Sequence, residues 1–272
     1  MGDEITEGLA ALLLQDMTRN KNIYWANEHG FFDEITPQEA LEITPRYRKP
    51  REEKDGRRQG KAEVFTPPEI VGEMVSSIWD GGKSGLSDRW LEITCGEGAF
   101  ITTRYHSQTG EAIPISERQG FLDRKLALCT AMSPSPAEWW NNALTALKSC
   151  YGYEYQGDSL FIARKNVLLS VREAWQERWG QDLNQEQVRA AAGVIRWNLW
   201  QMDGISECLP DPAYDIRKAK AAAKKGRAHL DRYSDKLGLI PARIVDWFGS
   251  EGSQEYRLVG RDGKAVQNTL LP

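Results

Sequence analysis

The stretch Trp90-Leu-Glu-Ile-Thr-Cys-Gly-Glu-Gly-Ala-Phe100 joins a short apolar segment to a glycine-rich turn. Residues 90–93 predict a buried strand, with Glu92 near its end. Gly96 and Gly98 let the backbone turn sharply and approach a ligand closely. In parallel α/β sheets, ligands bind in the crevice beyond the carboxyl ends of the strands. The segment therefore suits a nucleoside ligand, although a tight turn without a ligand is the alternative interpretation.

Two further acidic residues follow predicted strands. Residues 150–154 predict a strand that ends in Glu154, and a helical pattern begins at about Ser159. Residues 194–199 predict a third strand that runs into Asp203. A carboxylate at such a position accepts the hydroxyls of a ribose, and Asp203 suits an exocyclic amino group. Alternating strands and helices predict an α/β domain with a mostly parallel sheet.

The flanking regions predict further elements. Leu9, Leu12, Leu13 and Met17 recur at helical spacing, and Pro67 and Pro68 precede a helical pattern over 70–78. Residues 241–248 predict a buried strand, and Asp262-Gly263 a hairpin. We expect an N-terminal helical segment with a basic loop over 1–61 and a main domain over 62–272. The long connection from Gly98 to Glu154 predicts an insertion near 101–145.

The composition limits the class of protein. Of 272 residues, 40% are hydrophobic and 10% aromatic, which excludes a disordered chain, a collagen and a coiled coil. No apolar run approaches the roughly 20 residues that span a bilayer, so we expect no membrane partner. No signal peptide is visible, and the cysteine usage fits a reducing, cytoplasmic setting. Four widely spaced cysteines and three histidines predict neither a disulfide framework nor a metal site.

Charge is concentrated in two basic segments. Residues 46–61 contain many Lys and Arg together with Pro50, Gly56 and Gly60, which predicts a flexible loop. Residues 217–232 are rich in Ala and Lys and predict an exposed basic helix. Such segments are either solvated surface or contacts to the phosphates of a nucleic acid.

The order of these motifs resembles that of the amino-group DNA methyltransferases of restriction–modification systems, over roughly residues 62–215. Residues 64–68 are similar to the F-x-T-P element of the adenine-specific class, and residues 92–100 to its D-P-A-C-G-S-G-x-F element. Tyr151-Gly-Tyr-Glu154 with Ile162-Ala-Arg164 resembles the Y-G-x-E/D…A-R element. Residues 198–204 resemble the N-I-x-x-G-D element beside the cofactor adenine.

This resemblance implies a Rossmann-like class I methyltransferase fold and S-adenosyl-L-methionine as cofactor. DNA is the implied partner, and a separate specificity or restriction subunit is a further partner left open. By position in the motifs, the implied cofactor-binding residues are Phe65, Thr66, Pro67, Glu92, Thr94, Cys95, Gly96, Gly98, Glu154, Tyr155 and Asp203.

The family also implies base flipping and direct methyl transfer, here to adenine N6. Its [D/N]-P-P-[Y/F] loop is most similar to Asp211-Pro212-Ala213-Tyr214, in which Ala213 departs from the pattern. Asp211 would accept a hydrogen of the amino group, and the ring of Tyr214 would stack on the base. Asp246 and Trp247 are an alternative placement, and the absence of an intact catalytic loop is a third. A non-catalytic relative that binds S-adenosylmethionine or DNA, and a methyltransferase for RNA or cytosine N4, remain alternative functions.

Overall fold

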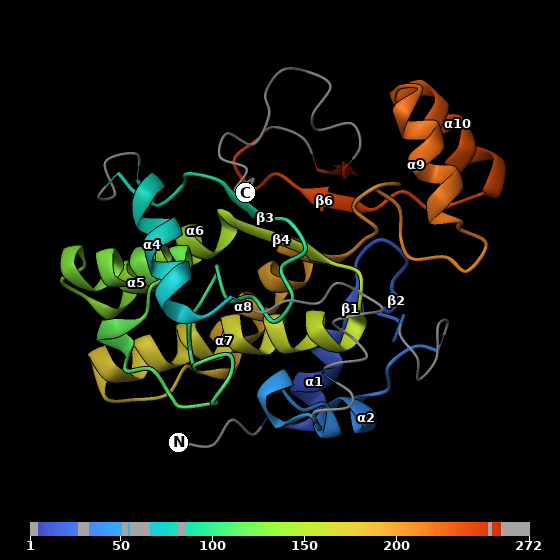
Figure 1. Cartoon of the computed structure of the whole chain (residues 1–272). Helices are drawn as coiled ribbons and strands as arrows, with labels where there is room; N and C mark the ends of the chain where they lie inside the picture. Colours follow the sequence, from blue (N-terminus) through green and yellow to red (C-terminus); the bar gives the residue numbers. More distant parts are fainter. Residues whose placement is uncertain are drawn as a thin grey trace.

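The computed structural model describes residues 5–26, 33–50, 54, 66–80, 85–249 and 252–256. At its centre is a three-stranded parallel sheet in the order β3–β4–β5. The strands are Trp90–Glu92, Cys150–Glu154 and Leu199–Gln201. Helices surround this sheet (Figure 1). The prediction of a mixed α/β fold with parallel strands is therefore confirmed.

Helices connect the parallel strands. Between β3 and β4 lie α5 (Phe121–Met132) and α6 (Pro136–Lys148), and between β4 and β5 lie α7 (Gly157–Trp179) and α8 (Gln185–Asn198). The predicted helix from about Ser159 is α7. The segment predicted as an insertion, 101–145, consists of an irregular stretch with the 3-10 turn η2 (Ile115–Glu117), followed by α5 and most of α6.

The prediction of a strand over residues 194–199 is wrong, because all but the last of these residues belong to α8. A capping box fixes the start of this helix: the Asn184 side chain accepts the Gln187 amide and the Gln187 side chain accepts the Asn184 amide, both at 2.9 Å. The alanines in its middle favour a helix over a strand. Only Leu199–Gln201 pair with β4, and Asp203 still follows this strand.

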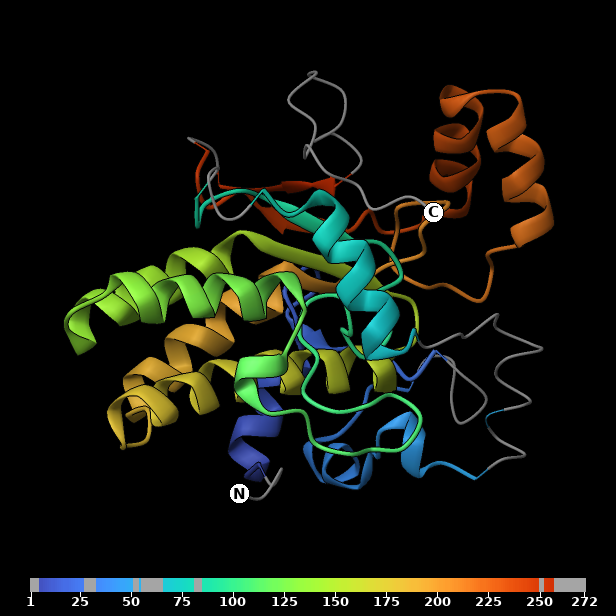
Figure 2. The same ribbon diagram turned by 60° about the vertical axis from the view of Figure 1, so that its left-hand side comes forward.

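Side chains alternate along each strand between the two faces of the sheet, so the apolar core consists of two clusters. Trp90, Cys150 and Leu199 join the core of the helical face. Leu91 and Trp200 join a second cluster on the opposite face. There an antiparallel pair, β6 (Arg243–Val245) and β7 (Ser253–Glu255), contributes Ile244, and the adjacent Ala242 and Tyr256 belong to the same cluster. The strand predicted over 241–248 is thus shorter, and it pairs with β7 instead of joining the parallel sheet (Figure 2).

The N-terminal region packs into the same core as the helices of the sheet. The predicted first helix is α1 (Glu7–Leu14), and Met17 lies beyond its end. The short strands β1 (Gln15–Asp16) and β2 (Lys21–Asn22) follow it, and then come α2 (Pro37–Glu42) and the 3-10 turn η1 (Arg46–Arg48). α1 contacts both α7 and α8.

Two further regions contain helices. The helix predicted after Pro67 is α4 (Pro68–Ile78). The single basic helix predicted over 217–232 is instead two helices, α9 (Ile216–Lys224) and α10 (Arg227–Leu237), which project from the rest of the molecule (Figures 1 and 2). Gly226 separates them with a φ of 111°, a conformation that favours glycine. The predicted hairpin at Asp262-Gly263 lies outside the described residues.

No helix among the described residues is both long enough and apolar enough to cross a membrane.

Candidate functional site

The glycine-rich segment Thr94 to Gly98, which follows β3 and is called the glycine turn below, has an unusual backbone conformation. Thr94, Gly96 and Gly98 all have positive φ angles, of 53°, 54° and 82°. A side chain at Gly98 would meet the Ala163 side chain at 3.3 Å, so glycine allows the turn to pack closely against α7. The buried Cys95 donates its amide to the Tyr153 carbonyl at 2.8 Å. The turn is thereby fixed to β4.

Glu154 joins the end of β4 to this turn. One of its carboxylate oxygens accepts the Gly96 amide at 2.8 Å, and the other accepts the amides of Tyr155 at 2.8 Å and Gln156 at 3.1 Å. Hydrogen bonds from backbone amides stabilise an ionised carboxylate. The Glu154 carboxylate therefore holds the glycine turn next to the residues that follow β4, at the edge of the sheet where the sequence predicts it.

Glu92 lies beside Glu154 without comparable support. Its side chain is buried, and its Oε2 atom has no hydrogen bond to any described residue. Burial, and secondarily the charge of Glu154, raises the pKa of Glu92 well above its ordinary value. A buried carboxyl with an unsatisfied oxygen favours a cationic ligand or a hydrogen-bond donor at this position.

We expect Glu92→Gln to raise the free energy of unfolding at neutral pH, by on the order of 1 kcal/mol. The folded pKa of Glu92 lies above the unfolded one, so its contribution to stability is complete below the unfolded pKa and is lost as pH rises through the folded pKa. Urea unfolding should therefore show a gain at neutral pH that disappears below about pH 4.

Glu154→Gln is the matched control for this prediction. Its carboxylate accepts three backbone amides, so the amide variant should lose stability at neutral pH. A Glu92→Gln protein that is less stable than wild type at neutral pH would contradict the description of Glu92 as an unsupported buried carboxyl.

Asp203 follows β5 at the same edge of the sheet. The Met202 amide donates to the Glu154 carbonyl at 3.0 Å, which keeps this segment next to β4. The Asp203 carboxylate accepts the amides of Ile205 at 3.0 Å and Ser206 at 2.7 Å. The acidic residues at the ends of all three parallel strands thus lie along one edge.

The segment from Asp211 to Tyr214 lies close to Asp203. Burial raises the pKa of Tyr155, and the charges of Asp203 and Asp211 raise it further. Burial and then Asp203 raise the pKa of Tyr214. The charges of Asp203 and Asp211 thus act on Tyr155, and the charge of Asp203 acts on Tyr214.

The Asp211 segment itself forms a turn. Oδ1 of Asp211 accepts the Ala213 amide at 2.8 Å, and the Asp211 carbonyl accepts the Tyr214 amide at 3.0 Å. Pro212 is exposed. The hydroxyl oxygen of Tyr214 is buried. The ring centroids of Tyr214 and Tyr233 are 6.3 Å apart.

Asp246 and Trp247 lie at the opposite edge of the sheet. Both oxygens of Asp246 accept Nη2 of Arg89, at 2.7 and 2.8 Å, and Arg89 immediately precedes β3. The Trp247 indole donates to Asn198 at 2.6 Å, just before β5 begins. These two residues therefore lie at the amino ends of the strands, away from the glycine turn.

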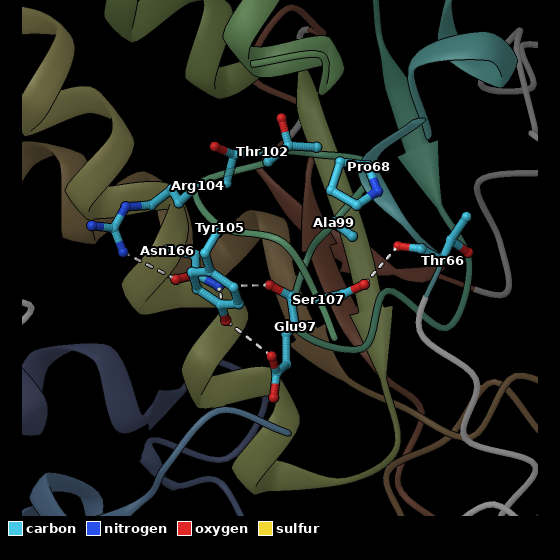
Figure 3. Close-up of a pocket in the computed structure, with 10 residues that line it drawn as sticks. Thr66, Pro68, Glu97, Ala99, Thr102, Arg104, Tyr105, Ser107 and Asn166 are labelled. Carbon is cyan, nitrogen blue, oxygen red and sulfur yellow. Dashed lines mark hydrogen bonds between the residues drawn. The ribbon is translucent and has the colours of Figure 1, made fainter. Parts of the chain in front are cut away.

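A small cavity lies beside the glycine turn. Thr66, Pro68, Glu97 and Tyr105 are among its lining residues, and its volume is about 20 Å³ (Figure 3). This space holds about one water molecule. The structure thus brings the predicted Thr66 and Pro67 segment next to the turn. Phe65 lies outside the described residues.

Sequence analysis missed the residues that support Glu97 in the middle of the turn. The Glu97 carboxylate accepts the Tyr105 hydroxyl at 2.9 Å, and its carbonyl accepts the Asn166 side chain at 3.0 Å (Figure 3). Asn166 is buried in α7 between the apolar Ala163 and Val167. A polar residue on an apolar helical face was the available signal.

The start of the basic segment 46–61 contacts this turn. The Arg46 amide donates to the Glu97 carboxylate at 2.6 Å, and Lys49 forms a largely buried ion pair with Asp158 at 2.9 Å. The ring centroids of Tyr47 and Tyr105 are 5.1 Å apart, in an edge-to-face arrangement. Residues 46–49 thus bind acidic groups of the protein itself, and most of the remaining segment lies outside the described residues.

Arg164, part of the predicted ribose-binding element, lies elsewhere. Its fully buried guanidinium donates to the carbonyls of Leu13 at 2.5 Å, Gln15 at 3.0 Å and Leu199 at 2.6 Å. It therefore connects α1, β1 and the start of β5.

Among the described residues, no three His, Cys, Asp or Glu side chains are arranged to hold a metal ion. All four cysteines are buried and have free thiols. No protein-family model, curated protein or solved structure matches the chain.

Proposed function

We propose that this protein is an S-adenosylmethionine-dependent DNA methyltransferase that acts on adenine N6, with a Rossmann-like sheet. The observation that carries the proposal is the shared edge of the sheet. Three neighbouring parallel strands end there in Glu92, Glu154 and Asp203, together with the glycine turn. The Asp211 to Tyr214 segment lies beside Asp203.

The residues at this edge fit the proposed cofactor. The unsatisfied Oε2 of Glu92 suits a positively charged group, and the backbone of Gly96 would allow a ligand to approach closely. Thr94, Cys95 and Tyr155 would complete the lining, with Asp203 at the end of β5. When bound, S-adenosylmethionine supplies an electrophilic methyl group.

The cavity at the turn is too small for such a ligand, because binding sites for small molecules measure roughly 300–1,000 Å³. Of the proposed cofactor-binding residues that the structure describes, only Thr66 lines this cavity, so the cofactor would lie outside it, along the edge formed by Glu92, Glu154 and Asp203.

In this proposal Asp211 receives a hydrogen of the adenine amino group. Its Oδ2 atom has no hydrogen bond to a described residue, which leaves it available as an acceptor. Tyr214 provides an aromatic ring for the flipped base, and stacking offsets part of the cost of unstacking. Because Asp246 and Trp247 lie at the other edge, we assign no role in the reaction to them.

The basic helix α9 suits the DNA backbone. Arg217, Lys220 and Lys224 of α9 are exposed and form no ion pair with a described residue, and Lys218 has only a contact of 3.9 Å to Asp215. Cations that are free of protein partners attract phosphates irrespective of sequence.

A second candidate is a relative that binds S-adenosylmethionine or DNA without transferring a methyl group. The burial of the Tyr214 hydroxyl favours it, since a ring that is packed in the protein is less available to a base. The departure from the family pattern at Ala213 points the same way.

The test is a calorimetric titration of S-adenosylmethionine, together with tritiated methyl transfer to mixed DNA. We expect wild type to bind and Glu154→Ala to bind at least about tenfold more weakly. The exposed Glu117→Ala is the control and should bind as wild type does. Circular dichroism reports whether Glu154→Ala remains folded.

Tritium label recovered in the DNA would support the proposal that the protein is a DNA methyltransferase. Binding without transfer supports the second candidate. A wild-type protein that binds no S-adenosylmethionine overturns both assignments of the cofactor site.

A further inference from the structure

A second and larger cavity shares Arg104 and Tyr105 with the small cavity beside the glycine turn. Its volume is about 560 Å³, within the range of roughly 300–1,000 Å³ that is typical of ligand sites. Residues of η1, the irregular stretch before α5 and the C-terminal part of α7 line it. The proposed function uses none of this space.

Charge does not select the ligand of this cavity. Glu173 forms ion pairs with both Arg104 and Arg118, the latter at 2.7 Å. The buried Asp123 also acts on Arg118, and Glu177 adds another carboxylate to the lining. Acidic groups therefore offset both guanidinium groups, so hydrogen bonds and shape decide which ligand fits.

Arg118 has donors available to a ligand. Its side chain is 8% exposed, its Nε donates to the Ile113 carbonyl at 3.1 Å and its Nη1 pairs with Glu173. No described residue accepts a hydrogen bond from its Nη2. Arginine N–H groups bind the O6 and N7 acceptors of guanine, which is the commonest specific contact between a side chain and a base.

Acceptors without partners lie on the α7 wall. Gln176 and Glu177 follow Glu173 by three and four positions, so the three residues share one face of the helix, with Cβ atoms about 5–6 Å apart. The Glu177 carboxylate and the side-chain amide of Gln176 form no hydrogen bond with a described residue. The cavity therefore has a free carboxylate about one helical turn from the Glu173 that Arg118 binds.

The remaining wall is aromatic and apolar. The rings of Tyr47 and Tyr105 meet edge to face, and Ile113, Pro114 and Ile115 add apolar surface. Nucleobases stack on aromatic side chains of this kind. The wall therefore complements the flat face of a base whose edges form its hydrogen bonds.

We propose that this cavity binds a guanine base, with O6 and N7 at Arg118 and with N1–H and the 2-amino group at Glu177. Guanine carries two acceptors on one edge and two donors on the next, in the order that these side chains require. Adenine has an amino donor in place of O6 and no N1–H, so it would present a donor to Arg118 and an acceptor to Glu177. This inference does not depend on the methyltransferase assignment.

The test compares two nucleosides of similar shape by calorimetry. We expect guanosine to bind the full-length protein at least about tenfold more tightly than adenosine, as the loss of charge-assisted hydrogen bonds implies. Arg118→Met and the exposed Glu177→Met should each bind guanosine at least about tenfold more weakly than wild type. Glu186→Met, at an exposed position of α8 outside the cavity, is the matched control and should keep the affinity of wild type.

A further variant tests the location of the site. Ala112→Trp fills the cavity from an exposed position and keeps its charges, so it should prevent guanosine from binding. If Arg118→Met does not fold, Glu177→Met decides, because its side chain is exposed. A wild-type protein that binds neither nucleoside, or both equally, overturns the proposal. So does guanosine binding that Glu177→Met or Ala112→Trp leaves unchanged.

A guanine base occurs both in nucleosides and in nucleic acids, and the single-stranded DNA pentamers TTGTT and TTATT separate these two sources. If TTGTT binds at least about tenfold more tightly than both guanosine and TTATT, the guanine belongs to a nucleic acid. If it does not, the ligand is a free guanine nucleoside.

Discussion

Replacing Arg164 with Met should lower the free energy of unfolding by about 3–5 kcal/mol, a large part of the stability of a typical domain. The substitution leaves the buried carbonyls of Leu13, Gln15 and Leu199 without this donor. Burial lowers the pKa of Arg164 to about 10, so the guanidinium is still charged at neutral pH. Urea unfolding followed by circular dichroism measures the loss.

Arg172→Met is the control within the same helix. Arg172 pairs with Asp182 at 3.0 Å, and the two side chains are 39% and 52% exposed. Exposed ion pairs of this kind contribute about 0–1 kcal/mol. If both variants unfold at the same urea concentration, Arg164 does not hold α1 and β1 to the sheet in the way that its hydrogen bonds indicate.

Local patterns predicted part of the fold, but not the helices α2, α5, α6 and α8. The β3 and β4 strands and helix α7 follow from short apolar runs and helical periodicity, and their packing agrees with those patterns. The third strand was misplaced because Val194, Ile195 and Trp197 have high β propensity. The Asn184 capping box and the alanines that follow it favour a helix instead, and β propensity alone does not weigh these signals against a β-branched pair.

The site was predictable where it depends on strand ends and not where it depends on distant packing. The acidic ends of parallel strands must meet at one edge, so Glu92, Glu154 and Asp203 follow from the sequence. The contact of Arg46 with Glu97 spans 51 positions in the chain, and no local pattern signals it. The opposite location of Asp246 likewise depends on its pairing with Arg89, 157 positions away.

Asp211→Ala should lower the rate of methyl transfer at least about a hundredfold, the lower range for a group that accepts a proton in the transition state. Asp211 is at the edge of the sheet that carries Asp203 and Tyr155, and its Oδ2 makes no hydrogen bond with a described residue. The affinity for S-adenosylmethionine should stay as in wild type. Single-turnover transfer of tritiated methyl groups to DNA measures the rate, and calorimetry measures the affinity.

Asp246→Ala is the matched control, because its carboxylate belongs to the alternative catalytic placement. Loss of the partly exposed pair with Arg89 should cost at most about 1 kcal/mol of stability and leave the rate of transfer unchanged. The reverse pattern would move the reaction to the amino ends of the strands and refute the shared-edge argument. If wild type transfers methyl groups and neither variant slows the transfer, neither carboxylate is the acceptor, because an essential acceptor cannot be removed without loss of rate.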